Sequence, residues 1–183
     1  WRQKDRERAY PQQIVTALTK EGYLSALIPE KYGGSGLGVS EASIILEEIN
    51  RSGGNSAGFH GQMYIMGALL RHGSESQKDR WLPPIAAGKL RLQAFSVTEQ
   101  EAGSDTTNIQ TYARKENDHY IISGHKNWTS RIQQSDLMLL LARTTPSDAV
   151  TTRTDGLSLF MIDLQDARRQ RDTLIVNPVK TMI

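Results

Sequence analysis

The chain has 183 residues, of which 38% are hydrophobic and 23% charged, and its formal net charge is +2. This balance predicts a soluble globular protein and argues against a nucleic-acid-binding one, because no basic run dominates the sequence. Without cysteine there is no disulfide or thiolate metal site, and without an apolar run of about 18 residues or a signal peptide we expect an intracellular protein.

The first fifty residues predict two helices separated by a glycine-rich turn. Residues 2–21 form the first helix, and Gly22 is typical of its end. The four glycines of residues 32–38 indicate either a turn between helices, which we favour, or a loop that folds over a ligand. Ser40 is expected to cap the second helix, residues 41–51. The side chains expected to face the core are Ile14, Val15, Leu18, Ile45, Leu46 and Ile49.

Residues 56–72 are apolar on nearly every face, which predicts a central helix. Its small residues would let the backbone approach a neighbour or a ligand closely. Met63, Tyr64 and Met66 indicate either plain core or the wall of a channel for a flexible ligand, because methionine adapts to irregular shapes. His60 and His72 have no third ligand nearby, so we expect no metal site.

A change of hydrophobic period divides the chain. Ser74 to Gln77 form a capping box that starts another helix, which is expected to stop at Pro83-Pro84. Beyond Arg91 the apolar residues alternate as in strands. We therefore predict an α+β organisation, with an all-α domain over residues 1–92 and a β-domain over residues 93–183.

The β-domain is organised around the segment from residue 92 to residue 130. An extended apolar stretch leads into a loop over residues 98–105, and a hairpin follows around the turn at residues 116–118. The second hairpin strand returns to the first loop, and the residues that it delivers there are Lys126, Trp128 and Ser130. Further strands are expected at residues 137–142 and 157–162 and, more faintly, at 173–179, with a surface loop over residues 144–155.

This segment also resembles a known family. The pattern F-x-V-T-E-x-x-A-G-S-D, followed by a hairpin ending in Y-x-I-x-G-x-K-x-W-T-S, resembles the flavin-binding signature of acyl-CoA dehydrogenases. The likeness continues upstream in residues 28–36 and 72–83, so it covers the family's first helical domain and part of its middle domain. It implies an incomplete antiparallel, β-barrel-like second domain. Both ends of the chain look cut, and we expect the family's C-terminal helical domain to be absent from it.

The resemblance implies that FAD binds at the hairpin. Trp128 would stack on the flavin, the Ser130 hydroxyl would serve N5, and Thr98 would lie on the pyrimidine side. The residues implied to bind the cofactor are Phe95, Val97, Thr98, Gly103, Ser104, Trp128, Thr129 and Ser130. Those implied to bind substrate are Met63, Met66, Gly67 and Ser104. Phe95 and Gln100 depart from the family, which often has Tyr and Pro there.

The implied reaction is α,β-dehydrogenation of an acyl-CoA thioester in fatty-acid or related acyl catabolism. Electron-transferring flavoprotein would accept the electrons, and the protein would form a homo-oligomer, either a dimer or a tetramer. The implied location is the bacterial cytoplasm or, alternatively, the mitochondrial matrix, with neither membrane nor nucleic acid as a partner. No position matches the family's catalytic glutamate, and Glu99 is expected to cap or form a salt bridge. The alternatives on this scaffold are an acyl-CoA oxidase, a nitroalkane oxidase, a flavin monooxygenase and a non-catalytic flavin-binding relative.

Overall fold

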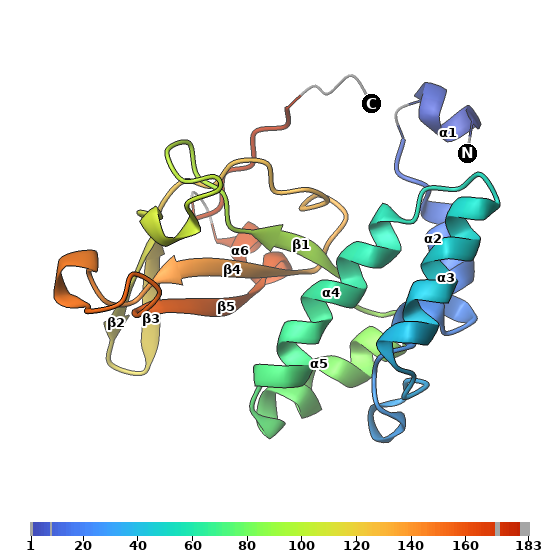
Figure 1. The fold of residues 1–183 in the computed structure, drawn as a ribbon, viewed down its shortest axis with the longest axis horizontal. Helices are drawn as coiled ribbons and strands as arrows, with labels where there is room; N and C mark the ends of the chain where they lie inside the picture. Colours follow the sequence, from blue (N-terminus) through green and yellow to red (C-terminus); the bar gives the residue numbers. More distant parts are fainter. Residues whose placement is uncertain (1, 8, 171–172, 180–183) are drawn as a thin grey trace.

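The computed structural model describes residues 2–7, 9–170 and 173–179. Its first half is helical and its second half is a sheet, and the two lie side by side (Figure 1). The helices of the first half are α1 (Arg2–Glu7), α2 (Gln12–Lys20), α3 (Val39–Arg51), α4 (Ala57–His72) and α5 (Glu75–Ala86). Short 3-10 segments are η1 (Tyr23–Ser25), η2 (Glu30–Tyr32), η3 (Thr106–Asn108) and η4 (Ser147–Ala149).

The N-terminal segment is two helices, so the prediction of one helix over residues 2–21 was wrong. Pro11 is the N-cap of α2. Proline has no amide hydrogen and a fixed φ, so it is tolerated at a helix start and disrupts a helix interior. The four-glycine stretch is a packed turn, in which Gly36 N donates to Ile28 O at 2.8 Å. A Cβ on Gly34 would lie 2.6 Å from the Ile28 carbonyl carbon, so this position requires glycine.

Two helix ends differ from their predictions. Gly38, not Ser40, caps α3, because the Glu41 carboxylate reaches back and accepts from Gly38 N at 2.9 Å. The capping box of α5 is confirmed: the Ser74 hydroxyl accepts from Gln77 N at 3.2 Å. The helix does not stop at Pro83 but continues to Ala86. Its apolar side chains around the two prolines are buried, and their burial outweighs the helical hydrogen bonds that proline removes.

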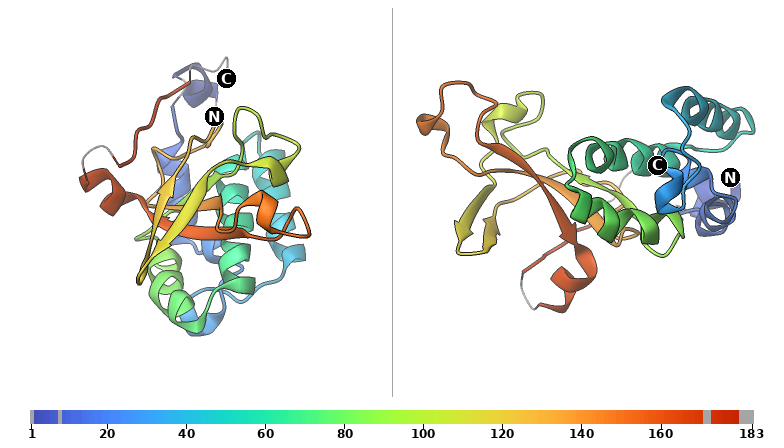
Figure 2. Two further views of the ribbon diagram at one scale, coloured as in Figure 1. Left: turned by 90° about the vertical axis from the view of Figure 1, so that its left-hand side faces the viewer. Right: turned by 90° about the horizontal axis from the view of Figure 1, so that it is seen from below.

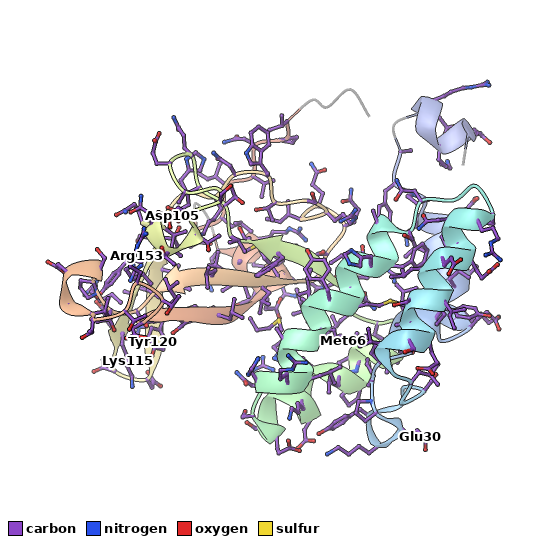
Figure 3. The ribbon with its side chains drawn as sticks, in the orientation of Figure 1. Glu30, Met66, Asp105, Lys115, Tyr120 and Arg153 are labelled. Atoms are coloured by element: carbon purple, nitrogen blue, oxygen red, sulfur yellow. The ribbon has the colours of Figure 1, made fainter. Side chains whose placement is uncertain are left out.

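The helix α4 is central, as predicted, and it joins the two halves of the molecule. One core cluster contains Ile65, Met66 and Leu69 of α4 together with residues of α5, β1 and β4. Figure 3 shows Met66 on this helix. Because the helical half and the sheet share this core, removing either half would expose apolar surface on the other.

The strands are β1 (Leu92–Ser96), β2 (Tyr112–Glu116), β3 (His119–Ser123), β4 (Leu137–Arg143) and β5 (Leu157–Asp163). They form one sheet in the order β1-β4-β2-β3, with β5 also on β4. The β2–β3 hairpin is antiparallel, as predicted, and lies at the end of the sheet farthest from the helices (Figure 2). The described sheet is not closed into a barrel.

The sheet is mixed rather than purely antiparallel. β4 pairs antiparallel with β5, but it pairs parallel with β1 and, at one position, parallel with β2. Nearly every residue of β4 is buried, which is typical of a strand with parallel neighbours and both faces covered. The prediction of an antiparallel domain was therefore wrong for two pairings, β1 with β4 and β2 with β4.

The faint strand predicted at residues 173–179 was also wrong. These residues belong to no strand: Leu174 packs against the core cluster of the sheet, but Ile175 is 75% exposed. A helix that was not predicted, α6 (Leu164–Arg169), precedes them. Asp163 caps it by accepting from Gln165 N at 2.9 Å and from Asp166 N at 3.1 Å. The surface loop predicted over residues 144–155 is confirmed, with η4 inside it.

Candidate functional site

The end of β1 lies against the segment that follows β3, so the predicted juxtaposition of these two stretches is confirmed. Lys126 Nζ donates to the carbonyl oxygen of Val97 at 2.8 Å, and Asn127 N donates to that of Thr98 at 2.8 Å. Farther along, the hydroxyl oxygens of Ser96 and Thr129 lie 2.9 Å apart. These contacts close the two stretches into one site.

Beneath this site lies a buried ion pair between Lys126 and Glu99. Nζ and Oε1 are 2.9 Å apart, and the two side chains are only 8% and 9% exposed. The Glu99 carboxylate also accepts from the backbone amides of Gln110 at 2.6 Å and Thr111 at 2.9 Å, and from the Thr111 hydroxyl. The sequence predicted that Glu99 either caps a backbone segment or forms a salt bridge, and it forms the salt bridge.

These contacts decide the charge of Glu99. Burial raises the pKa of its carboxyl, but the hydrogen bonds from Gln110, Thr111 and Lys126 outweigh burial and lower the pKa to about 2. Burial lowers the pKa of Lys126, against the opposing effect of Glu99. A carboxylate that is held ionised by four donors is a structural anion and a poor proton acceptor near neutral pH.

Trp128 is the large apolar side chain that the site exposes to solvent. Its side chain is 69% exposed, and its backbone has φ 60°, in the left-handed region that bulky residues rarely adopt. Ser130 is exposed as well, and its hydroxyl has no hydrogen-bond partner among the described residues. The Thr129 hydroxyl, in contrast, is already bonded to Ser96. The segment thus presents an indole and a hydroxyl outward on an anchored backbone.

The remaining residues predicted to bind cofactor lie on β1 and in the loop that follows it. Phe95 packs against the shared core, and Val97 and Thr98 are half-buried. Gly103 and Ser104 are exposed in the loop, and a Cβ on Gly103 would have nothing within 4 Å. Beyond them, Asp105 pairs with Arg153 of the loop before β5 (Figure 3). The loop is therefore restrained at its far end while its glycine stays open to a ligand.

The residues predicted to bind substrate do not share one environment on α4. Met63 and Met66 are 3% and 0% exposed, and Met66 belongs to the core. Gly67 is half-buried, and a Cβ there would have nothing within 4 Å. Tyr64, half-exposed, lies between His60 and Phe95, with ring centroids 4.9 and 6.2 Å away.

Tyr64 was expected, together with Met63 and Met66, to belong either to the core or to the channel wall, whereas His60 was not assigned to the site, although the i, i+4 spacing of His60 and Tyr64 places both on one helix face. They lie on the side of α4 that carries the Tyr64–Phe95 contact, whereas Met66 packs into the core. No cluster of three or more potential metal-ligating side chains occurs among the described residues. Within the same residues, no helix has the length and apolar character needed to cross a bilayer.

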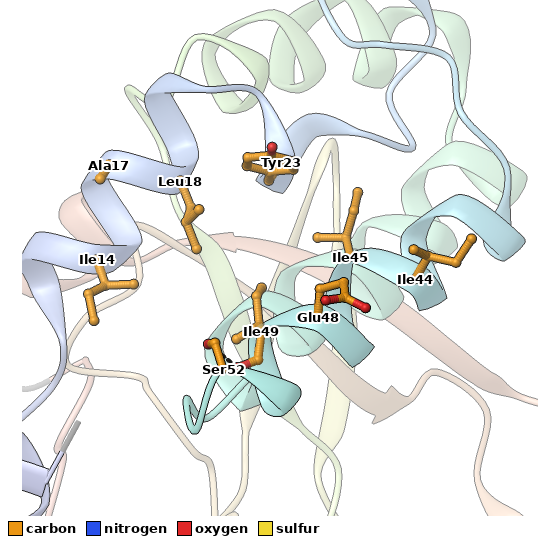
Figure 4. Close-up of a pocket in the computed structure, with 9 residues that line it drawn as sticks. All are labelled: Ile14, Ala17, Leu18, Tyr23, Ile44, Ile45, Glu48, Ile49 and Ser52. Carbon is orange, nitrogen blue, oxygen red and sulfur yellow. Dashed lines mark hydrogen bonds between the residues drawn. The ribbon is translucent and has the colours of Figure 1, made fainter.

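A cavity of about 610 Å³ lies elsewhere, between α2, η1 and α3 (Figure 4). Its lining is mainly apolar and consists of Ile14, Ala17, Leu18, Tyr23, Ile44, Ile45, Glu48, Ile49 and Ser52. None of the residues predicted to bind cofactor or substrate lines this cavity. Three residues expected to face the core on α3, Ile45, Leu46 and Ile49, are only half-buried, and two of them line it.

Two family models match consecutive parts of the chain. The acyl-CoA dehydrogenase N-terminal domain matches residues 1–89, and the acyl-CoA dehydrogenase middle domain matches residues 94–183. The (2S)-methylsuccinyl-CoA dehydrogenase of Cereibacter sphaeroides is 34% identical over 86% of this chain and 28% of its own length. The mitochondrial isovaleryl-CoA dehydrogenase of Pongo abelii is 34% identical over 78% of this chain and 33% of its own length.

The fold is similar to that of solved structures. The prolyl acyl carrier protein oxidase AnaB superimposes with a TM-score of 0.82 and 26% identity, over 97% of this chain and 46% of its own. The chain thus spans less than half of the length of each of these proteins.

Proposed function

Because this chain belongs to the acyl-CoA dehydrogenase family, we propose that the protein catalyses FAD-dependent α,β-dehydrogenation of an acyl-CoA thioester. The observation that carries the proposal is the exposed indole of Trp128, held at the end of β1 by contacts on both of its sides. An exposed indole face is suited to a planar ring system. Gly103 is open to a ligand, and the Ser130 hydroxyl has no hydrogen-bond partner among the described residues, so the residues present fit a flavin.

In this proposal each residue has one task. Trp128 stacks on the isoalloxazine, and the Ser130 hydroxyl donates to N5, since it is the hydroxyl of the pair 129–130 that is not already bonded. Thr98 serves the pyrimidine edge. Gly103 and Ser104 lie at the pyrophosphate, where backbone N–H groups of a tight turn can face an anion. Phe95, Val97 and Thr129 complete the support.

When bound, FAD supplies the acceptor for the hydride that leaves the β-carbon of the acyl group, while a base removes the α-proton. The residues of this chain bind and orient the ring system and hold the donor at N5. Glu99 does not serve as the base in our proposal. A general base works best with a pKa near the operating pH, and the pKa of Glu99 is about 2.

The acyl chain is proposed to run along α4, next to Gly67, where the space beside the helix is open. Met63 and Met66 would support this wall from the core side. One solved structure similar to this chain is that of an electron transferring flavoprotein of Acidaminococcus fermentans, with a TM-score of 0.77 and 27% identity. We propose such a flavoprotein as electron acceptor and a homo-oligomer as the working assembly.

The proposal is tested by Trp128→Ala in the full-length protein, with Trp81→Phe on α5 as the control. Loss of a stacked indole should weaken FAD binding by about 1–3 kcal/mol, by analogy with aromatic stacking on bases. The stability of the protein without FAD should change little, because the indole is largely exposed. Equal flavin occupancy in Trp128→Ala and the parent after dialysis would remove Trp128 from the site.

A second candidate is an acyl thioester oxidase on the same scaffold, because the prolyl acyl carrier protein oxidase aligns over 97% of this chain. The two activities differ in how the reduced flavin is reoxidised. Stopped-flow mixing of the substrate-reduced protein with oxygen separates them: slow reoxidation supports the dehydrogenase, and rapid reoxidation with hydrogen peroxide release supports the oxidase.

A further inference from the structure

The ion pair between Lys126 and Glu99 ties together the stretches that form the proposed flavin site. The Lys126 ammonium contacts the Glu99 carboxylate at 2.9 Å and the Val97 carbonyl oxygen at 2.8 Å. Glu99 in turn holds the backbone amides of Gln110 and Thr111, directly before β2. The ion pair therefore joins three separate stretches of the chain, residues 97–99, residues 110–111 and the stretch that contains Lys126.

For a buried ion pair, removing one charge and removing both charges have different consequences. If one partner is removed, the other is left as an uncompensated charge away from water, which is costly. If both are replaced by neutral groups, the fold can be retained. The two kinds of change therefore separate the general stability of the protein from the local arrangement that the pair imposes.

Trp128 follows Lys126 by two residues and has a backbone conformation that needs outside support. Its φ of 60° is unfavourable for a residue with a bulky side chain. Such conformations persist when their surroundings over-determine them. Here the residues on either side are fixed, Asn127 to Thr98 at 2.8 Å and Thr129 to Ser96 at 2.9 Å.

We propose that Glu99 and Lys126 are a positioning pair that holds Trp128 in its left-handed conformation and so presents the indole face to the cofactor. Neither residue touches the cofactor, and both act through Trp128. This inference rests on the proposed flavin site, but it also makes a claim about the segment in the absence of FAD. The two claims are measured separately.

The test compares Lys126→Met with Lys115→Met, an exposed lysine of β2, in the full-length protein. Hydrogen–deuterium exchange without FAD, followed by mass spectrometry, reports local opening of residues 124–131, with residues 57–72 as the internal reference. We expect Lys126→Met to speed exchange in residues 124–131 far more than in residues 57–72, and to raise the Kd for FAD about tenfold. Lys115→Met should change neither. Unchanged exchange in residues 124–131 of Lys126→Met would overturn the proposal.

A double-mutant cycle then separates positioning from a general loss of stability. In the Trp128→Ala background, Lys126→Met should raise the Kd for FAD by less than about twofold, because the pair acts through the missing indole. Losses that simply add would contradict the proposal, since Lys126 would then act independently of Trp128.

If Lys126→Met alone does not fold, the double variant Lys126→Met/Glu99→Gln takes its place, because it leaves no unpaired charge. The same local rise in exchange is expected, and parent-like exchange with a parent-like Kd overturns the proposal. If the parent protein binds no FAD, the proposed function fails, and the exchange measurement still decides whether Lys126 holds this segment.

Discussion

A Cβ on Gly124 would lie 2.7 Å from the Cα of Thr111, closer than real Cβ atoms come to another atom. The segment that leaves β3 therefore crosses directly over the residue that binds Glu99. The Thr111 Cα is backbone and the Thr111 hydroxyl is bonded to Glu99, so a larger residue at position 124 can be accommodated only if one of the two chains moves.

Gly124→Ala is therefore expected to lower the free energy of unfolding by about 1–3 kcal/mol, as overpacking does. Gly67→Ala is the matched control, because nothing lies within 4 Å of a Cβ there and the residue is inside α4. That change should raise the free energy of unfolding by about 0.5–1 kcal/mol. Urea denaturation measures both, and equal stabilities for the two variants would contradict the close approach.

The stability of the protein should depend on pH through Glu99. Its pKa is lowered in the folded state from 4.5 to about 2, so ionised Glu99 contributes stability that is fully present above pH 4.5 and is lost as pH falls toward 2. The shift corresponds to about 3 kcal/mol at most. Glu99→Gln should flatten the unfolding free energy between these pH values, whereas Glu101→Gln, an exposed neighbour, should leave the profile unchanged. A parent-like slope in Glu99→Gln would show that the carboxylate is not stabilised by folding.

Thr129→Val should change the stability of the protein, whereas Ser130→Ala should change the rate of flavin reduction. The Thr129 hydroxyl is bonded to Ser96, so Thr129→Val should lower the free energy of unfolding by about 0.5–1.5 kcal/mol. The Ser130 hydroxyl is free for the flavin, so Ser130→Ala should leave stability unchanged and slow flavin reduction by an acyl-CoA. Thermal unfolding and stopped-flow bleaching of the flavin measure the two effects. An unchanged reduction rate in Ser130→Ala would exclude it as the donor to N5.

Gly67→Leu should shorten the acyl chain that the protein accepts. The new side chain would fill the open space beside α4, so kcat/KM should fall more for long-chain than for short-chain acyl-CoA substrates. Met66→Ala is the contrast, because Met66 is fully buried in the core and its loss should cost about 2–5 kcal/mol of stability. A uniform fall of kcat/KM across chain lengths in Gly67→Leu would indicate altered packing instead of a substrate contact.

The features predicted correctly from the sequence depend on local signals. The hairpin has turn residues at its tip, and the capping box of α5 needs only Ser74 and Gln77. The errors concern interactions that local sequence does not contain. Whether β1 lies parallel to β4 depends on the path of the forty residues between them, and whether α5 continues past Pro83 depends on what Leu82 and Ile85 pack against.

The site was predicted in the same uneven way. The approach of Lys126 to the loop follows from hairpin geometry, and the structure has it. The environment of Glu99 could be predicted only in part: a salt bridge was one expected role, but two of the four donors are backbone amides, at Gln110 and Thr111, which any sequence would supply. The sequence also could not predict whether the Met66 side chain points into the core or toward a ligand, because a helix that is apolar on nearly every face has no preferred face.

The parallel pairing of β1 with β4 also determines when the site can form as the protein is made. Phe95 and Ser96 pair with Leu139 and Leu140, so this ladder closes a loop of more than forty residues, whereas the hairpin needs only its own turn. Local hairpins form within about 1–10 μs, and long-range pairing is slower because loop closure costs entropy before any contact is gained. On the ribosome, residue 140 must leave the exit tunnel before β1 has its partner. Trp128 is therefore synthesised, and already exposed, before the strand that completes its surroundings exists.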